Sequence, residues 1–304
     1  MSAVQQRLDR GEVLILDGAT GTELERRGVP MDDVAWDAAA LLTHADTVRE
    51  VHEDYIRAGA DVIITNTFAT ARHVLEPAGM GERFHELNTR AVALAKEARE
   101  NVANGSVFIA GSVSTFTAWY DYGYEPGAER AQANYREQAE VLAASGVDMI
   151  ALEMMRDIEQ TSYALEAAMT TGLPVWIGFS CKTTDEGTVV LWDGEHTLTK
   201  ALEQILPLGA SLVSIMHTLT EDTLPALQEV NAHWSGRLGA YPHSGQFIMP
   251  NWQYIDMISP EDFAAEARLW LEIGAQLIGG CCGIGPEHIR LLKERLPARV
   301  PTEG

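Results

Sequence analysis

The chain reads Ala275-Gln276-Leu277-Ile278-Gly279-Gly280-Cys281-Cys282-Gly283 near its end, a short apolar run followed by two adjacent thiols between glycines. Adjacent cysteines are difficult to join to each other, whereas two thiolates at the end of a strand suit a soft metal such as zinc. The glycines let the backbone turn tightly around such a group. This stretch therefore predicts a buried strand that ends at a metal site.

Similar apolar runs recur along the chain and alternate with longer segments of helical periodicity. The eight runs cover residues 13–16, 61–65, 107–110, 148–152, 174–179, 211–216, 238–241 and 275–278. Strands without polar alternation indicate a parallel sheet covered on both faces. Eight such units predict an α/β fold, a (β/α)8 TIM-type barrel with residues 1–304 as a single domain. A doubly wound open sheet is the alternative, but its Gly-x-Gly-x-x-Gly turn is missing after Leu16.

Helical spacing and capping signals predict helices over 43–58, 84–102, 260–273 and 286–296. The third of these begins with Ser259-Pro260-Glu261-Asp262, which combines an N-cap residue, a proline and two acids in the first turn. Two long segments, 114–129 and 244–259, are expected to be loops that build the site or an oligomer contact.

The bulk composition limits the classes of partner and location. The chain has 304 residues, 46% of them hydrophobic, and a net charge of −22, which disfavours nucleic acid and anionic membranes as partners. Three cysteines argue against a disulfide framework and for a reducing compartment. The first ten residues carry no apolar signal segment, and no run reaches the ~18–20 apolar residues of a membrane span. We therefore expect a cytoplasmic protein, and its oligomeric state is left open.

The chemistry of such barrels lies at the carboxyl ends of the strands. The residues that follow the eight runs are Asp17, Asn66-Thr67, Gly111-Ser112, Glu153, Ser180-Cys181, His217-Thr218, Pro242-His243 and Cys281-Cys282. We expect His217, Cys281 and Cys282 to form a zinc site with His243 as a candidate fourth ligand, although either histidine could be structural. Cys181 is expected to be a small buried hydrophobe.

Two further groups point to a cationic ligand. Asp17 and Glu153 at the rim suit an ammonium group, because a desolvated cation needs compensating negative charge. Capping a helix or pairing with an arginine are their alternative roles. An aromatic cluster between 116 and 124 is either a lid or subunit interface, or a cation–π wall for an onium compound. Its members are Phe116, Trp119, Tyr120, Tyr122 and Tyr124.

These segments together resemble the homocysteine S-methyltransferase family. The matching segments are 16–24, 60–68, 110–113, 152–153 and, most specifically, Gly279-Gly280-Cys281-Cys282-Gly283-Ile284-Gly285-Pro286-Glu287-His288-Ile289. The resemblance implies a zinc-dependent barrel enzyme that methylates the thiol of homocysteine to give methionine. It implies a zinc site of three cysteines, two of which match Cys281 and Cys282. It also implies that Asp17 and Glu153 hold the amino group of homocysteine.

The chain departs from the family pattern at three places. His217 stands where the family has the third cysteine, and Tyr241-Pro242-His243 replaces an asparagine after the seventh strand. Both changes introduce imidazole, an acceptable zinc ligand, so we interpret the site as rebuilt and not lost. The family's Gly-Pro-Tyr-Gly loop is replaced by Ser114-Thr115-Phe116-Thr117-Ala118-Trp119, where a methyl donor is expected. The predicted substrate-binding residues are Asp17, Thr67, Ser112, Glu153, Trp119 and Tyr120.

The expected partners are a small thiol acceptor and a small onium methyl donor. One barrel leaves no room for a cobalamin or folate domain, so we expect a donor that is used directly: S-methylmethionine, S-adenosylmethionine, another sulfonium or a betaine. A methyltransferase for a different thiol or selenol, and a catalytically silent zinc-binding barrel, are the alternatives. A metal-dependent hydrolase is a further alternative, but it would need more histidines at the strand ends than this sequence has there.

Overall fold

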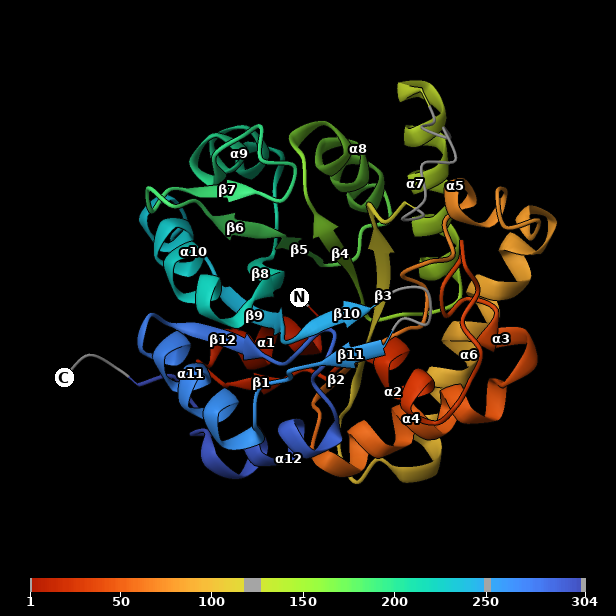
Figure 1. Ribbon diagram of the computed structural model, residues 1–304, viewed down its shortest axis with the longest axis horizontal. Coiled ribbons are helices and arrows are strands. Elements are labelled where there is room, and N and C mark those ends of the chain that lie inside the picture. The colour runs from red at the N-terminus through yellow and green to blue at the C-terminus, as the bar shows by residue number, and fades with distance from the viewer. Residues whose placement is uncertain (1, 118–126, 249–252, 302–304) are drawn as a thin grey trace.

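The computed structural model describes residues 2–117, 127–248 and 253–301. Its main sheet has eight strands in the order β1-β12-β9-β8-β5-β4-β3-β2, with every neighbouring pair parallel. A parallel bridge between Leu16 and Val62 joins β1 to β2 and closes the sheet into a barrel (Figure 1). The strands are β1 (Leu14–Ile15), β2 (Val62–Ile64), β3 (Phe108–Ser114), β4 (Met149–Met155), β5 (Val175–Phe179), β8 (Leu212–Leu219), β9 (Leu238–His243) and β12 (Ala275–Ile278). The predicted TIM-type fold and its eight strands are confirmed.

Helices surround the barrel (Figure 1). They are α1 (Ala3–Asp9), α2 (Thr20–Arg26), α3 (Ala40–Thr43), α4 (Ala45–Ala58), α5 (Arg72–Leu75), α6 (Phe84–Val102), α7 (Ala128–Ala144), α8 (Ile158–Met169), α9 (Leu198–Ile205), α10 (Thr220–His233), α11 (Pro260–Glu272) and α12 (Pro286–Arg295), with 3-10 turns η1 (Gly81–Arg83) and η2 (Leu206–Leu208). The four predicted helices lie within two residues of their expected bounds. No helix among the described residues is long and apolar enough to cross a membrane.

Local chemistry explains where these helices begin and end. The Ser259 hydroxyl accepts a hydrogen bond from the Asp262 amide at 3.1 Å, and Pro260 occupies the first helical position of α11. Helix α4 ends at Gly59, which adopts a φ of +105° that favours glycine. Helix α6 buries Leu87, Ala91 and other residues at helical spacing against the barrel.

Two antiparallel hairpins extend the loops that follow β5 and β9. The first pairs β6 (Cys181–Thr183) with β7 (Val189–Leu191), and the second pairs β10 (Gln246–Ile248) with β11 (Gln253–Ile255). The second hairpin lies inside the segment 244–259, which was expected to be a loop. Three-residue strands give too short a pattern for periodicity to predict.

The barrel strands are buried along most of their length, and β3, β4 and β5 are buried at every position. Because all eight strands run in the same direction, the residues at their carboxyl ends meet at one rim of the barrel. The polar residues expected at that rim therefore lie in one region of the molecule.

Candidate active site

The turn after β12 brings the thiol pair against the carboxyl ends of the two neighbouring strands, β1 and β9. The Gly280 amide donates to the Asp17 carbonyl at 3.0 Å, and the Cys281 amide donates to the Pro242 carbonyl at 2.7 Å. A Cβ atom on Gly279 would lie 2.5 Å from Leu16 Cβ, and one on Gly280 would lie 2.3 Å from Ile284 Cβ. The glycines are therefore required by close backbone packing, as the sequence indicates.

The third member of the cluster, His217, lies on a bulge of β8. Its φ is +44°, and the pairing with β9 shifts register between Met216 and Leu219. The Ser180 hydroxyl donates to the His217 carbonyl at 2.8 Å. The Thr218 hydroxyl donates to the Met216 carbonyl at 2.9 Å and accepts from the Cys181 amide at 2.9 Å. These bonds hold a backbone conformation that is rare for a non-glycine residue.

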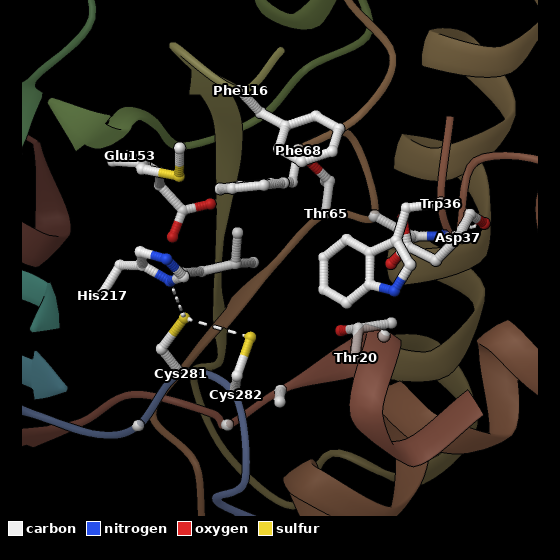
Figure 2. A pocket seen from close by; sticks show the side chains of 17 residues that line it. Thr20, Trp36, Asp37, Thr65, Phe68, Phe116, Glu153, His217, Cys281 and Cys282 are labelled. Atoms are coloured by element: carbon white, nitrogen blue, oxygen red, sulfur yellow. Dashed lines mark hydrogen bonds between the residues drawn. The ribbon is translucent and has the colours of Figure 1, made fainter. Parts of the chain in front are cut away.

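The bulge places the imidazole beside the thiols (Figure 2). His217 Nδ1 lies 3.8 Å from Cys281 Sγ, and Cys281 Sγ lies 3.9 Å from Cys282 Sγ. All three ligand atoms lie within 4.8 Å of one another. Tetrahedral zinc, with Zn–S of about 2.3 Å, separates two sulfurs by roughly 3.8 Å and a sulfur from a nitrogen by roughly 3.6 Å. The residues present therefore fit a zinc ion.

The protonation chemistry of the thiols agrees with this fit. Contact with Cys282, and then burial, hold the pKa of Cys281 well above its ordinary value. A neighbouring cation is the usual means of ionising buried thiols at neutral pH.

The candidate fourth ligand, His243, does not join the cluster. Its ring centroid lies 4.9 Å from that of His217, and Trp192 packs against both rings at 5.9 Å and 6.3 Å. Its Nδ1 is buried without a hydrogen-bond partner in the described part of the chain, and burial is the main reason that its pKa falls to about 4. His243 therefore packs against the His217 ring and lies outside the group of three ligand atoms. Cys181 is fully buried in β6, away from the cluster, as expected of a small apolar residue.

Glu153 at the rim faces the same cavity as the cluster. It is 6% exposed, and the Ser112 hydroxyl donates to its Oε2. Burial raises the pKa of Glu153 to about 7, and the Ser112 hydrogen bond opposes that shift. Glu153 is thus a carboxylate whose ionised form would be stabilised by a positive partner, and the described residues that line the cavity include no lysine or arginine.

Three other predicted substrate-binding residues do not line the cavity and lie behind its wall: Asp17, Thr67 and Ser112. Asp17 Oδ2 accepts from the Ile64 amide at 2.8 Å, its Oδ1 has no partner within the ranges that the structure describes, and burial raises its pKa well above the ordinary value. The Thr67 hydroxyl donates to the Ser112 carbonyl at 2.8 Å. The cavity is lined there by residues close to them in the sequence, Gly18, Thr65 and Asn66. Trp119 and Tyr120 lie outside the described residues, as do Tyr122 and Tyr124.

Sequence reasoning missed Trp36 and Asp37 at one wall of the cavity. They line it together with Phe68 and with Phe116, a member of the predicted aromatic cluster. The Trp36 and Phe68 rings meet edge to face with centroids 6.0 Å apart, and Phe68 and Phe116 are 5.3 Å apart. Figure 2 shows Trp36 and Asp37 across the cavity from His217 and Glu153. Neither Trp36 nor Asp37 follows a strand, so the search of strand ends could not find them.

The barrel and the polar cluster at its carboxyl-end rim define the class of molecule, an α/β-barrel enzyme with its site at the strand ends. The family described as homocysteine S-methyltransferase matches residues 14–296, which include all eight barrel strands. This chain belongs to that family, and it is a methyltransferase. Its partners are accordingly a small thiol acceptor and a methyl donor.

Individual relatives support the assignment over the whole chain. The homocysteine S-methyltransferase of Escherichia coli strain K12 is 30% identical over 311 residues, 95% of this chain and 96% of that protein. The selenocysteine methyltransferase of Astragalus bisulcatus is 29% identical, with 92% and 91% covered. The crystal structure of the metallated form of the homocysteine methyltransferase MmuM from Escherichia coli matches with a TM-score of 0.81 at 29% identity, over 96% of this chain and 99% of that one.

Proposed function

We propose that the chain transfers a methyl group from a small onium donor to the thiol of homocysteine, with zinc held by His217, Cys281 and Cys282. The observation that carries the proposal is the convergence of these three ligand atoms within 4.8 Å at the wall of one cavity. Zinc bound there would supply thiolate activation, because coordination deprotonates a thiol that is mostly protonated at neutral pH.

The charge of this donor set differs from that of the three cysteines implied by the family. One neutral imidazole and two thiolates around Zn²⁺ sum to zero, whereas three thiolates sum to −1. The His217 set therefore favours ionisation of an incoming thiol, at some cost in the nucleophilicity of the thiolate. A donor with a good neutral leaving group, such as a sulfonium, suits that site.

The side chains around the cluster would bind and orient the acceptor. Glu153, held by Ser112, lies beside His217 and would accept hydrogen bonds from the ammonium group of homocysteine (Figure 2). Asp17, whose ionised form burial disfavours, would add negative charge from behind the wall once a cation is bound. The aromatic wall of Trp36, Phe68 and Phe116 would exclude water and face the cationic donor. Transfer forms the bond between acceptor sulfur and methyl carbon while the electron pair of the broken bond stays on the donor. No general base is needed at that step.

The test is methionine formation measured by mass spectrometry with zinc-replete protein, homocysteine and each of S-methylmethionine, S-adenosylmethionine and glycine betaine. We expect methionine with at least one donor, and loss of activity after thorough chelation that added zinc restores. Absence of methionine with every donor, or full activity after chelation, would contradict the proposal.

A second acceptor has specific support. The relative from Astragalus bisulcatus is named as a selenocysteine methyltransferase at 29% identity. Replacing homocysteine by selenocysteine in the same assay separates the two acceptors. Glu153 would bind the ammonium group of either one, but the two differ in chain length and in the atom, sulfur or selenium, that takes the methyl group. The cytoplasmic location and the single domain over residues 1–304 stay predictions.

A further inference from the structure

Asp37 is a buried carboxylate for which the acceptor chemistry provides no role. It is 2% exposed, lines the cavity, and its Oδ1 has no hydrogen-bond partner among the described residues. Asn66 Nδ2 reaches its backbone carbonyl at 3.4 Å and not its carboxylate. A charged or polar group buried in this way is costly unless something else compensates it.

Asp37 follows a turn that is held by backbone and side-chain hydrogen bonds. The Asp32 amide donates to the Trp36 carbonyl at 2.7 Å, and Asp32 Oδ1 accepts from the amides of Val34 and Ala35 at 2.9 Å and 2.8 Å. Trp36 has a φ of +46°, and its indole fits so closely over Gly21 that a Cβ there would lie 2.4 Å from Trp36 Cζ2. Non-glycine residues are held in this region only where surrounding contacts impose it. Asp37 is therefore held at the cavity wall by a defined structure.

The protein itself supplies no cation to this carboxylate. The described residues that line the cavity include no lysine or arginine, and none of the ion pairs formed within the described part of the chain involves Asp37. The sequences 118–126 and 249–252 contain no lysine or arginine either. A cationic ligand in the cavity would therefore compensate the ionised form of Asp37, which burial disfavours.

Glu153 and Asp37 lie on opposite sides of the cavity, with the thiols near its floor (Figure 2). This inference rests on the proposed function, in which Glu153 binds the ammonium group of the acceptor. Asp37 is then available to bind the second ligand, the methyl donor. We propose that Asp37 recognises the positive charge of the methyl donor and so selects donors with a net positive charge, sulfonium amino acids above all, over net-neutral betaines. A betaine has no net positive charge, because its carboxylate cancels its ammonium charge, so Asp37 would attract it less strongly than a sulfonium amino acid.

This role has a kinetic signature. A sulfonium donor is positively charged before the reaction and partly so in the transition state. A contact that acts in both states lowers KM with little effect on kcat. A merely structural role for Asp37 would instead disturb both substrates or lower kcat through a distorted site.

The test compares Asp37→Asn with wild type and with Asp33→Asn, an exposed acid of the same turn, in zinc-replete protein. For Asp37→Asn we expect the KM for S-methylmethionine to rise at least about tenfold, the KM for homocysteine and kcat to change less than about threefold, and the preference over glycine betaine to shrink. Asp33→Asn should match wild type. Unchanged donor KM in Asp37→Asn, or equal changes for both substrates, would overturn the inference.

Binding separates this inference from the proposed function. Calorimetric titration with S-methylmethionine, without acceptor, should give a Kd at least about tenfold weaker for Asp37→Asn than for wild type. A wild-type protein that makes no methionine but binds S-methylmethionine through Asp37 would refute the proposed function and leave the cation site standing. If wild type makes methionine and Asp37→Asn binds the donor as tightly as wild type, the proposed function stands and the inference about Asp37 is refuted. Wild type that does not bind S-methylmethionine overturns the inference.

Discussion

His217 Nδ1 lies 3.8 Å from Cys281 Sγ, although the two residues are 64 positions apart and β9 separates β8, which holds His217, from β12, which Cys281 follows. The contact depends on the bulge in β8, where His217 has a φ of +44°. Position 217 must therefore satisfy two requirements at once, a rare backbone conformation and a ligand atom at the cavity.

Substitutions at 217 separate these requirements. Asparagine tolerates a positive φ but is a poor zinc ligand, so His217→Asn should fold and lose zinc affinity. The loss should exceed the roughly 10–100-fold that removal of an outer hydrogen-bond partner costs. His217→Cys should keep one zinc per chain, because a thiolate replaces the imidazole. Zinc content by elemental mass spectrometry and affinity by chelator competition measure both. Full zinc affinity in His217→Asn would rule out this ligand.

Ser180 is predicted to position His217 through the backbone. Ser180→Ala removes the hydrogen bond to the His217 carbonyl, so zinc affinity should fall roughly 10–100-fold while the chain loses about 1 kcal/mol of stability. Ser214→Ala is the matched control, because the Ser214 hydroxyl makes a similar 2.9 Å bond to the Ile177 carbonyl between β8 and β5. It should cost comparable stability and leave zinc affinity unchanged. Equal zinc affinities in the two variants would show that the bulge needs no support from Ser180.

The sequence predicted the barrel because parallel barrel strands are apolar on both faces and short, which leaves a repeated signal. It also predicted which residues meet at the rim, since strand direction alone decides that. It did not predict which of them face the cavity. The Asp17 and Thr67 side chains form hydrogen bonds with the backbone of neighbouring strands. His217 reaches the cavity through a bulge in β8 that no local sequence pattern predicts.

Asp37 was beyond strand-end reasoning for a different reason. It belongs to a turn before the four-residue helix α3, and it reaches the cavity only through the contacts of Asp32 and Trp36. Loops of this kind are fixed by tertiary packing and not by periodicity. The charge of the residue was visible in the sequence, but its burial was not.

Glycine at 279 is predicted to be required for the thiol pair. In Gly279→Ala the new Cβ would meet Leu16 Cβ at 2.5 Å and the Asp17 carbonyl at 2.8 Å, so overpacking should cost about 1–3 kcal/mol and displace the thiols. Gly105→Ala is the control, because nothing lies within 4 Å of a Cβ there. Urea unfolding measures the stability of both, and chelator competition measures zinc affinity. Wild-type values for Gly279→Ala would show that the strand can move aside at no cost.

Glu153 is predicted to act on the acceptor and not on the metal. Glu153→Gln keeps the shape but removes the negative charge, so the KM for homocysteine should rise at least about tenfold with zinc content unchanged. Ser112→Ala should produce a smaller rise, because the carboxylate stays in place without its hydrogen bond. Steady-state kinetics with the acceptor varied at saturating donor checks both. A change confined to the KM for the donor would reassign Glu153 to the other substrate.

The acid sensitivity of the fold is predicted to depend in part on His52. This residue of α4 is fully buried, neither ring nitrogen has a hydrogen-bond partner among the residues that the structure describes, and burial lowers its pKa to about 4. A lowered pKa means that the folded chain binds fewer protons than the unfolded chain, so the stability it contributes is present above pH ~6.5 and is lost as the pH falls towards 4.

In metal-free protein, His52 should account for about 2 kcal/mol of the stability lost between pH 7 and pH 5. His52→Leu removes this titration and keeps an apolar group of similar size, so its free energy of unfolding should fall less steeply over that range than that of wild type. His85→Leu, on an exposed position of α6, should keep the wild-type slope. Urea unfolding at half-unit pH steps gives the comparison. Parallel curves for His52→Leu and wild type would contradict a lowered pKa for the buried imidazole.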